Sequence, residues 1–353
     1  MKKIFKDTSG SRMQPLSSKK NGEVDCPVKA DAQGYLYYKS RLPYTERTVY
    51  ETVKKGMLNG NGRISLDAIP TKRCEDIFNA VLLDTPMLFY INGCSVIESG
   101  RKTDLMPKYM IPNSEYRRYE QNCVKALRLL CEKTGRSTWD NLLSLHEGLI
   151  SRIRYREGRQ EAHDIIGPLL QHEGVCDGIA KSVKAACDLM CIPCIVVRGE
   201  ARRENGEIGS HAWNVIKVDE DWRFFDFTFD ITLNQSNPCR KIQRMDYFSI
   251  TYEEMSVDHF KWSASIESFN KGKDYFERNN MIVRRQEELD RIICNSCSKP
   301  LERAYKVDRS WKNYENGMAL KVAVNKLIEK TGFSCRYSFA FNEGQRVGYV
   351  RIE

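Results

Sequence analysis

The sequence predicts an α+β fold, in which one helix packs on an antiparallel sheet between a helical N-terminal region and a small α+β C-terminal region. Three observations predict it. Apolar residues recur at helical spacing through much of residues 45–145. A helical stripe follows residue 176, and alternating strand patterns flank a tight turn at residues 219–220. Strand and helix patterns then return beyond residue 300.

The 353 residues divide into four segments. Residues 1–40 are polar, rich in Lys and Ser and weakly patterned, so we expect a leader that is at least partly disordered. Residues 41–145 form the mostly helical N-terminal region. We place the functional core at residues 146–265 and the small α+β region at residues 266–353.

Two features of the N-terminal region fix its details. The strongest two-residue turn signal, Asn92-Gly93, predicts a hairpin between strands 87–91 and 94–97. Ser137 and Asp140 have the spacing of a capping box, which predicts the start of a helix that runs past His146.

Composition and charge exclude several classes of protein. The chain is 41% hydrophobic and 29% charged, an ordinary globular balance. No stretch approaches the ~18 uncharged apolar residues of a membrane helix, and no apolar segment follows the basic N-terminus as it would in a secretory signal. The net charge of +9 is mild, with acids interleaved throughout, so a nucleic-acid partner is the weakest alternative.

The 13 cysteines form an odd set without an export signal, which predicts a cytoplasmic protein with mostly buried, reduced thiols. Cys191 and Cys194, like Cys294 and Cys297, have the two-residue gap of a zinc or redox pair. The two pairs lie far apart, whereas zinc-ribbon pairs are separated by ~15–20 residues. Cys194 also begins an apolar strand pattern. We therefore expect no metal and no cofactor.

Cys176 lies at the start of a helix with one buried face, formed by Ile179, Val183, Ala186, Cys187 and Met190. Free backbone N–H groups and the positive end of the helix dipole stabilise an anion there. A thiol in this position is suited to act as a thiolate nucleophile. Gly174 and Gly178 would leave room for the backbone of a substrate.

A hairpin follows, in which residues 210–218 and 221–230 alternate as two strands around the turn at 219–220. With a two-residue turn, Val218 pairs with Asp221 and Asp226 lies opposite Trp213. His211 is then on the same face as Asp226. Such diagonal neighbours are ~7 Å apart at the backbone, which the two side chains can span.

These three residues match a catalytic triad. Cys176 would be the thiol nucleophile, His211 its base, and Asp226 the residue that orients the base. Asp230 shares the strand parity of Asp226 and is the alternative orienting residue. Three other histidines have weaker claims. His146, in an apolar helix, is expected to be structural, whereas His163 and His172 could line the cleft or lie at the surface.

Three motifs, in chain order, carry a resemblance to a known superfamily. Gly-Val-Cys-Asp-Gly-Ile-Ala at 174–180, His-Ala-Trp-Asn at 211–214 and Asp-Phe-Thr at 226–228 resemble the transglutaminase-like superfamily of papain-type thiol enzymes, especially its bacterial members. The likeness spans residues 145–260, with similar patterns reaching back to about residue 48. It implies a papain-like core with Cys176 as nucleophile, His211 as base and Asp226 as orienting carboxylate.

The motifs and the resemblance imply acyl transfer on peptide or protein amides through a thioester. The Cys176 backbone amide and one further donor would meet the oxyanion. Water would resolve the thioester by protease-like hydrolysis, which we favour, and a primary amine would give transamidation. The alternative is a non-catalytic peptide-binding module on the same fold. The sequence leaves the substrate and the oligomeric state open.

Overall fold

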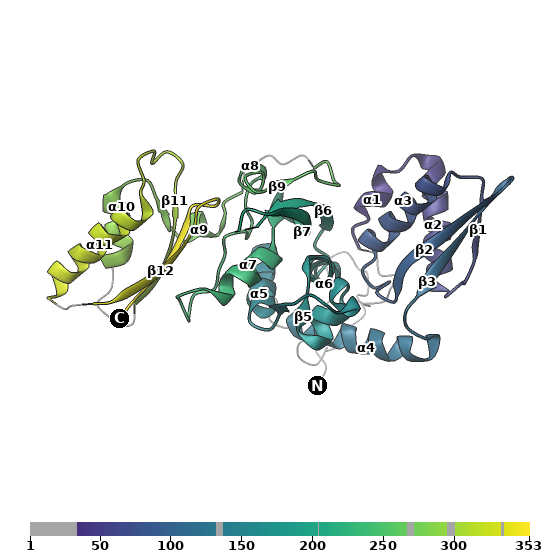
Figure 1. Ribbon diagram of the computed structural model, residues 1–353, viewed down its shortest axis with the longest axis horizontal. Coiled ribbons are helices and arrows are strands. Elements are labelled where there is room, and N and C mark those ends of the chain that lie inside the picture. The colour runs from purple at the N-terminus through teal and green to yellow at the C-terminus, as the bar shows by residue number, and fades with distance from the viewer. Residues whose placement is uncertain (1–33, 132–136, 204, 267–271, 295–300, 333–334) are drawn as a thin grey trace, which may run out of the picture.

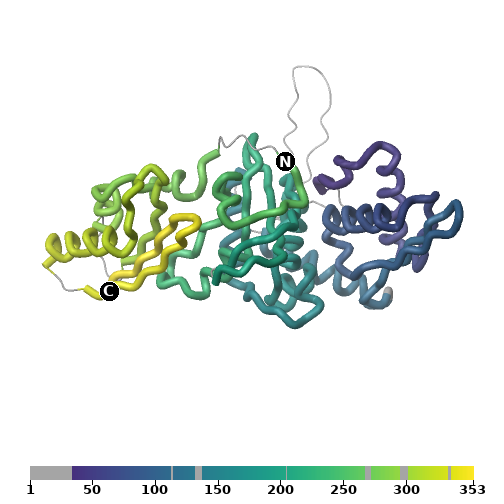
Figure 2. The backbone as a smooth tube through the Cα atoms, turned by 45° about the horizontal axis from the view of Figure 1, so that its top comes forward, coloured from purple at the N-terminus to yellow at the C-terminus, as the bar shows by residue number. Residues whose placement is uncertain are grey.

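Three lobes follow one another along the long axis of the molecule (Figure 1), and the turned view shows the same order (Figure 2). The computed structural model describes residues 34–131, 137–203, 205–266, 272–294, 301–332 and 335–353. Helices and strands are mixed in all three lobes, as an α+β fold requires. Within these ranges, none of the helices combines the length and apolar composition that a membrane crossing demands.

The N-terminal lobe is a helical layer beside a small antiparallel sheet. The helices are α1 (Tyr37–Arg41), α2 (Tyr44–Leu58) and α3 (Thr71–Asp84). The strands, in the spatial order β1-β3-β2, are β1 (Ile64–Asp67), β3 (Lys102–Tyr109) and β2 (Ile91–Ser99). The long helix α4 (Asn113–Leu130) then leads towards the central lobe.

The predicted hairpin at Asn92-Gly93 is wrong. Strand β2 continues through this dipeptide, and the chain turns at Gly100, which has a φ of 60°. Gly93 has a φ of 91° and lies where the β2–β3 register shifts, between Ile91 and Cys94. A glycine with positive φ serves a β-bulge as well as a turn, so the dipeptide alone does not distinguish them. The lobe therefore contains a three-stranded sheet beside its helices.

The leader was predicted to end at residue 40, which places its end too late in the chain. Residues 1–33 lie outside the described residues, but residues 34–40 belong to the fold. The backbone N–H groups of Tyr38 and Lys39 donate to the buried carboxylate of Asp84, at 3.1 and 2.9 Å. The Tyr38 hydroxyl donates to the carbonyl of Val196 at 2.7 Å, which ties this segment to the central lobe.

The central lobe contains a four-stranded antiparallel sheet in the order β8-β7-β6-β9. Its strands are β6 (Cys194–Arg202), β7 (Ile208–Val218), β8 (Asp221–Phe225) and β9 (His259–Phe260). Helix α6 (Cys176–Leu189) packs on this sheet, and α5 (Thr138–Ile150), α7 (Phe227–Gln235) and α8 (Tyr252–Met255) surround it. The Ser137 side chain caps α5 by accepting from Asp140 N–H, as predicted.

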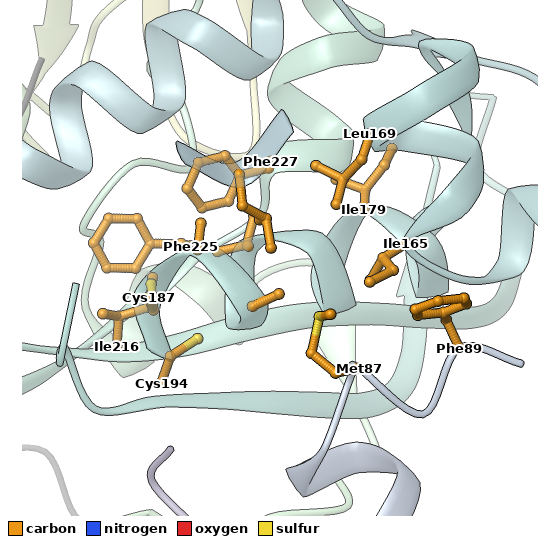
Figure 3. Packing of buried hydrophobic residues seen from close by; sticks show 14 of the residues in the cluster. Met87, Phe89, Ile165, Leu169, Ile179, Cys187, Cys194, Ile216, Phe225 and Phe227 are labelled. Carbon is orange, nitrogen blue, oxygen red and sulfur yellow. The ribbon is translucent and has the colours of Figure 1, made fainter. Parts of the chain in front are cut away.

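Before α6 the chain forms a short parallel pair, β4 (Arg154–Tyr155) and β5 (Glu173–Gly174), with the 3₁₀ segment Gln160–His163 and the π segment Gly167–Gln171 between them. The buried face of α6 meets the sheet in an apolar core (Figure 3). There Cys187 of α6 lies near Cys194 of β6, Ile216 of β7 and Phe225 of β8.

The C-terminal lobe contains α9 (Tyr275–Arg278), α10 (Gln286–Cys294), α11 (Asn316–Thr331) and a sheet in the order β10-β11-β13-β12. Its strands are β10 (Ile282–Val283), β11 (Leu301–Val307), β12 (Tyr337–Asn342) and β13 (Val347–Ile352). The lobe is joined to the central core, because Val347 and Tyr349 belong to the same hydrophobic cluster as core residues of the central and N-terminal lobes. Tyr349 also accepts the Met245 N–H at 2.7 Å.

Gly174 and Gly178 serve chain packing rather than an approaching substrate. A Cβ at Gly178 would clash with the carbonyl oxygen of Ala162, and a Cβ at Gly174 would lie 2.6 Å from the ring of Pro168. Helix α6 can therefore approach the preceding loop closely only because these positions have no side chain.

We predict that Gly178→Ala destabilises the fold. Gly→Ala inside a helix ordinarily stabilises by ~0.4–1 kcal/mol, but overpacking against a backbone carbonyl costs ~1–3 kcal/mol. Gly317→Ala in α11 is the matched control, because nothing lies within 4 Å of its added Cβ. Thermal unfolding should show a lower midpoint for Gly178→Ala and an unchanged or higher midpoint for Gly317→Ala. Equal effects would contradict the packing argument.

Candidate active site

Cys176 is the first residue of α6, and its position is fixed by contacts of its neighbours. The preceding Val175 N–H donates to the Ala162 carbonyl at 3.1 Å. Asp177 accepts three hydrogen bonds from Arg198 of β6, at 2.8, 2.9 and 2.9 Å, and pairs with Lys181 at 2.6 Å. Burial raises the pKa of Asp177, but Lys181 and Arg198 outweigh it, so the net shift is downward.

A second tie links the helix to the strand that carries the histidine. The Asn214 side chain on β7 donates to the carbonyl of Ala180 in α6 at 2.9 Å. Asn214 belongs to the same motif as His211. The motif therefore supplies both an imidazole and the hydrogen bond that holds the nucleophile helix against its strand.

The predicted register of the hairpin is confirmed. Val218 pairs with Asp221 across the two-residue turn, and Asp219 adopts a φ of 54° that this tight turn needs. Strand β8 nevertheless ends at Phe225, five residues earlier than the pattern of 221–230 predicts. Asp226 becomes the N-cap of α7, because its Oδ1 accepts the N–H groups of Thr228 and Phe229 at 2.9 and 3.1 Å.

The structure brings the three predicted site residues together. His211 Nε2 lies 2.6 Å from Asp226 Oδ2, so the other ring nitrogen is free to face Cys176, which lines the same cleft. Burial lowers the pKa of His211 most strongly, but the charge and hydrogen bond of Asp226, followed by those of Cys176, raise it to about 10. His211 and His259 together hold the pKa of the fully buried Asp226 well below its usual range, although burial raises it.

Asp230 is not the orienting residue. Because α7 begins at Phe227, the strand parity that linked Asp230 to Asp226 does not apply. Asp230 instead lies 2.8 Å from His146 Nε2 and accepts the Tyr247 N–H at 3.1 Å.

Burial lowers the pKa of His146 to about 3 and raises that of Asp230. His146 is thus a buried hydrogen-bonding residue, and His163 and His172 are exposed outside the cleft.

His259, which sequence reasoning missed, completes the surroundings of Asp226. Its Nε2 lies 3.1 Å from Asp226 Oδ2, and its Nδ1 lies 2.6 Å from Oδ1 of the adjacent Asp258. The residue sits on β9, which pairs with β6 on the far side from β7. The only local feature of the sequence at His259 is the dipeptide Asp258-His259. No spacing rule relates this dipeptide to His211, so the sequence did not predict that His259 belongs to the site.

His211, Asp226 and His259 offer three possible metal-ligand atoms within 4.8 Å of one another. A tetrahedral zinc ion ~2.0–2.2 Å from each ligand would require ~3.3 Å between ligand atoms. The 2.6 and 3.1 Å contacts to one shared carboxylate oxygen are instead typical of hydrogen bonds. The geometry therefore fits a hydrogen-bonded unit better than a metal centre.

The two cysteines of the first Cys-x-x-Cys pair lie in different surroundings. Cys191 is exposed, whereas Cys194 is buried in the core and accepts from Asn214 Nδ2 at 3.5 Å. Of the second pair, Cys294 packs beside α11, and Cys297 lies outside the described residues. The cysteines of the described ranges are all free thiols.

A cleft of about 700 Å³ opens beside Cys176 and His211. Its lining includes the apolar side chains of Phe229, Leu233 and Val257. Charged side chains of both signs also line it, from Arg202, Arg203, Asp258 and Glu343. Residues 341–344 of the lining come from the C-terminal lobe, at the end of β12 and the turn that follows it. The cleft is large enough to bury a segment of several residues.

No family model and no curated protein matches this chain. Among solved structures, the chain is similar to a TGase, at 14% identity and a TM-score of 0.29, over 53% of this chain and 56% of that chain. It is also similar to a candidate cysteine protease from Cytophaga hutchinsonii, at 10% identity and a TM-score of 0.26, over 38% and 61%. A candidate protease from Parabacteroides distasonis is 7% identical with a TM-score of 0.24, over 74% and 61%. The chain thus spans less than two thirds of each of these proteins.

We predict opposite charge states for two buried histidines. In an NMR titration of the five histidines, His211 should remain protonated at pH 8 and His146 neutral at pH 5, because their pKa values are about 10 and about 3. Asp226→Asn should lower the His211 value markedly. A His211 midpoint near 6.5 in the parent protein would contradict the ion-pair geometry.

The His211–Asp226 pair makes the free energy of unfolding depend on pH. The raised pKa of His211 stabilises the fold fully below its ordinary value of 6.5, and this contribution is lost as the pH rises towards about 10. Between pH 7 and pH 10, the free energy of unfolding should therefore fall less in His211→Gln than in the parent protein. Chemical unfolding of both proteins across that range measures it, and parallel curves would contradict the assignment.

Proposed function

We propose that the chain is a transglutaminase-like thiol enzyme that hydrolyses amide bonds in peptides or proteins. One observation carries the proposal: a cysteine at a helix N-terminus lines the same cleft as an imidazole that is paired with a fully buried carboxylate. In the proposed triad, Cys176 is the nucleophile, His211 the acid and base, and Asp226 the orienting residue. The motif resemblance supports the same three roles.

Acylation begins with the thiolate of Cys176 and the imidazolium of His211. The sulfur attacks the amide carbonyl, and the oxyanion develops beside the free N–H groups of the first turn of α6. His211 then gives its proton to the leaving nitrogen, the C–N bond breaks, and a thioester remains. Asp226 keeps the second ring nitrogen protonated and the ring oriented throughout.

Deacylation reverses the proton movement. Neutral His211 takes a proton from a water molecule, whose oxygen attacks the thioester carbonyl. The carboxylic acid leaves, and the thiolate–imidazolium pair is restored. A primary amine in place of water would give transamidation at the same site. The proposed substrate is an extended segment, because the lining of the cleft extends from Cys176 to residues 341–344 of the C-terminal lobe and includes apolar side chains.

The non-catalytic alternative makes a different prediction for thiol reactivity. We expect iodoacetamide at pH 6 to alkylate Cys176 at least ~10-fold faster than Cys191, because Cys176 lies at a helix N-terminus in the same cleft as His211. Cys191 is the internal control, since it is exposed whereas Cys176 is half-buried. His211→Ala should abolish the preference. Equal rates for the two thiols, measured by peptide mass spectrometry, would favour a binding module.

Turnover should depend on all three residues. With a proteome-derived peptide library, mass spectrometry should detect new termini for the parent protein and none for Cys176→Ala or His211→Ala. Asp226→Asn should lower kcat by ~10²–10⁴-fold, because the imidazole loses its oriented tautomer. Added primary amine separates hydrolysis from transamidation by the mass of the product. Near-parental turnover by Cys176→Ala would refute the mechanism.

A further inference from the structure

A buried hydrogen-bonded chain runs behind the proposed catalytic pair and ends in the C-terminal lobe. We propose that His259 is a positioning residue for the His211–Asp226 pair, and that Gln345 of the C-terminal lobe holds His259 in place through Asp258. This inference rests on the proposed function of the same site. It is carried by the contacts of His259 and not by the resemblance to other enzymes.

Asp226 has two sets of donors, and His259 belongs to the second. Oδ1 accepts two backbone N–H groups from the start of α7. Oδ2 accepts His211 Nε2 at 2.6 Å and His259 Nε2 at 3.1 Å. Without His259, the oxygen that faces the catalytic imidazole would be held only by that imidazole. His259 therefore fixes the carboxylate oxygen against which His211 is oriented.

His259 can supply this donor without adding net charge. Its Nδ1 lies 2.6 Å from Asp258 Oδ1, so one proton lies between these two atoms while Nε2–H points at ionised Asp226. If that proton is on His259, the pair is an imidazolium and a carboxylate; if it is on Asp258, both groups are neutral. In either case the pair contributes a hydrogen-bond donor and no net charge to the site.

Asp258 is in turn held by two donors on its other oxygen. The Tyr247 hydroxyl donates to Oδ2 at 2.7 Å, and Gln345 Nε2 donates to it at 3.2 Å. Gln345 follows β12 in the turn to β13, is buried, and also donates to the Glu254 carbonyl at 3.1 Å. The continuous order is Gln345, Asp258, His259, Asp226 and His211. The lobe that forms one wall of the cleft thus also supports the imidazole.

The burial of His259 indicates a specific use for its polar atoms. The residue is 1% exposed, and its ring packs against Trp213, Phe229 and Tyr247, at centroid distances of 4.8, 5.1 and 5.8 Å. The titratable groups that face it are Asp226, Asp258, Tyr247 and His211. A polar ring in such a place is costly unless each nitrogen is satisfied, and both are.

Two substitutions separate positioning from packing. His259→Leu removes the donor to Asp226, whereas His259→Gln can place an amide N–H where Nε2 was. For His259→Leu we expect kcat to fall by ~10-fold or more with KM nearly unchanged, because the base is misoriented. With one donor fewer, Asp226 interacts more strongly with the imidazolium, so NMR should show the His211 midpoint moving up by ~0.5 pH or more. His259→Gln should restore both values towards those of the parent.

The role of the C-terminal lobe is tested by Gln345→Leu. This variant should change kcat and the His211 midpoint in the same directions as His259→Leu, with a smaller effect of ~3-fold on kcat. Glu302→Gln is the matched control. Glu302 accepts the N–H groups of Arg240 and Lys241 at 3.0 and 2.7 Å, so it also joins the lobe to the central core but lies outside the chain to Asp226. The Glu302→Gln variant should lower the midpoint of thermal unfolding and leave kcat and the His211 titration midpoint unchanged.

The outcomes distinguish this inference from the proposed function. If Cys176 of the parent protein is no more reactive than Cys191, the proposed function fails. If the parent is active and His259→Leu alters only thermal stability, His259 is merely structural and the inference is overturned. If His259→Leu does not fold, His259→Gln and Gln345→Leu decide. Parental pH profiles in Gln345→Leu would overturn the link to the C-terminal lobe.

Discussion

The buried carboxylate of Asp226 is the constraint on which the rest of the site depends. A charge with no solvent exposure costs several kcal/mol unless it is fully compensated. Four hydrogen bonds compensate it here, two from the start of α7 and one from each of His211 and His259. The donors to the Asp226 carboxylate come from the N-terminus of α7 and from strands β7 and β9, so these three elements meet at Asp226. Cys176, at the start of α6, lines the cleft beside them.

Two buried His–Asp contacts show how the surroundings decide protonation. His211 and His146 each lie within hydrogen-bond distance of one aspartate, at 2.6 and 2.8 Å. The partner of His211 has backbone donors that stabilise its charge, and the pKa of the imidazole rises. Asp230 is buried near Asp246, so its own pKa rises and the charged form of His146 is not supported. The same residue pair is therefore charged in one place and neutral in the other.

The C-terminal lobe is part of the site rather than an appendage. Its strand β13 contributes Tyr349 to the central core, the residues after β12 form a wall of the cleft, and Gln345 reaches Asp258. A substrate segment lying in the cleft would therefore contact two lobes. Any change in how the lobes dock would therefore alter both the lining of the cleft and the contact between Gln345 and Asp258.

The sequence by itself determined what local rules govern. The first turn of α6 at Cys176, the cap at Ser137 and the two-residue turn that puts His211 and Asp226 on one face all follow from hydrogen bonds between near neighbours in the chain. The tertiary structure alone decided that β2 passes through Gly93, that His259 meets Asp226, and that Gln345 reaches Asp258. These contacts join segments far apart in the sequence. Their partners are selected by packing and by the need to satisfy buried charge, which no local pattern encodes.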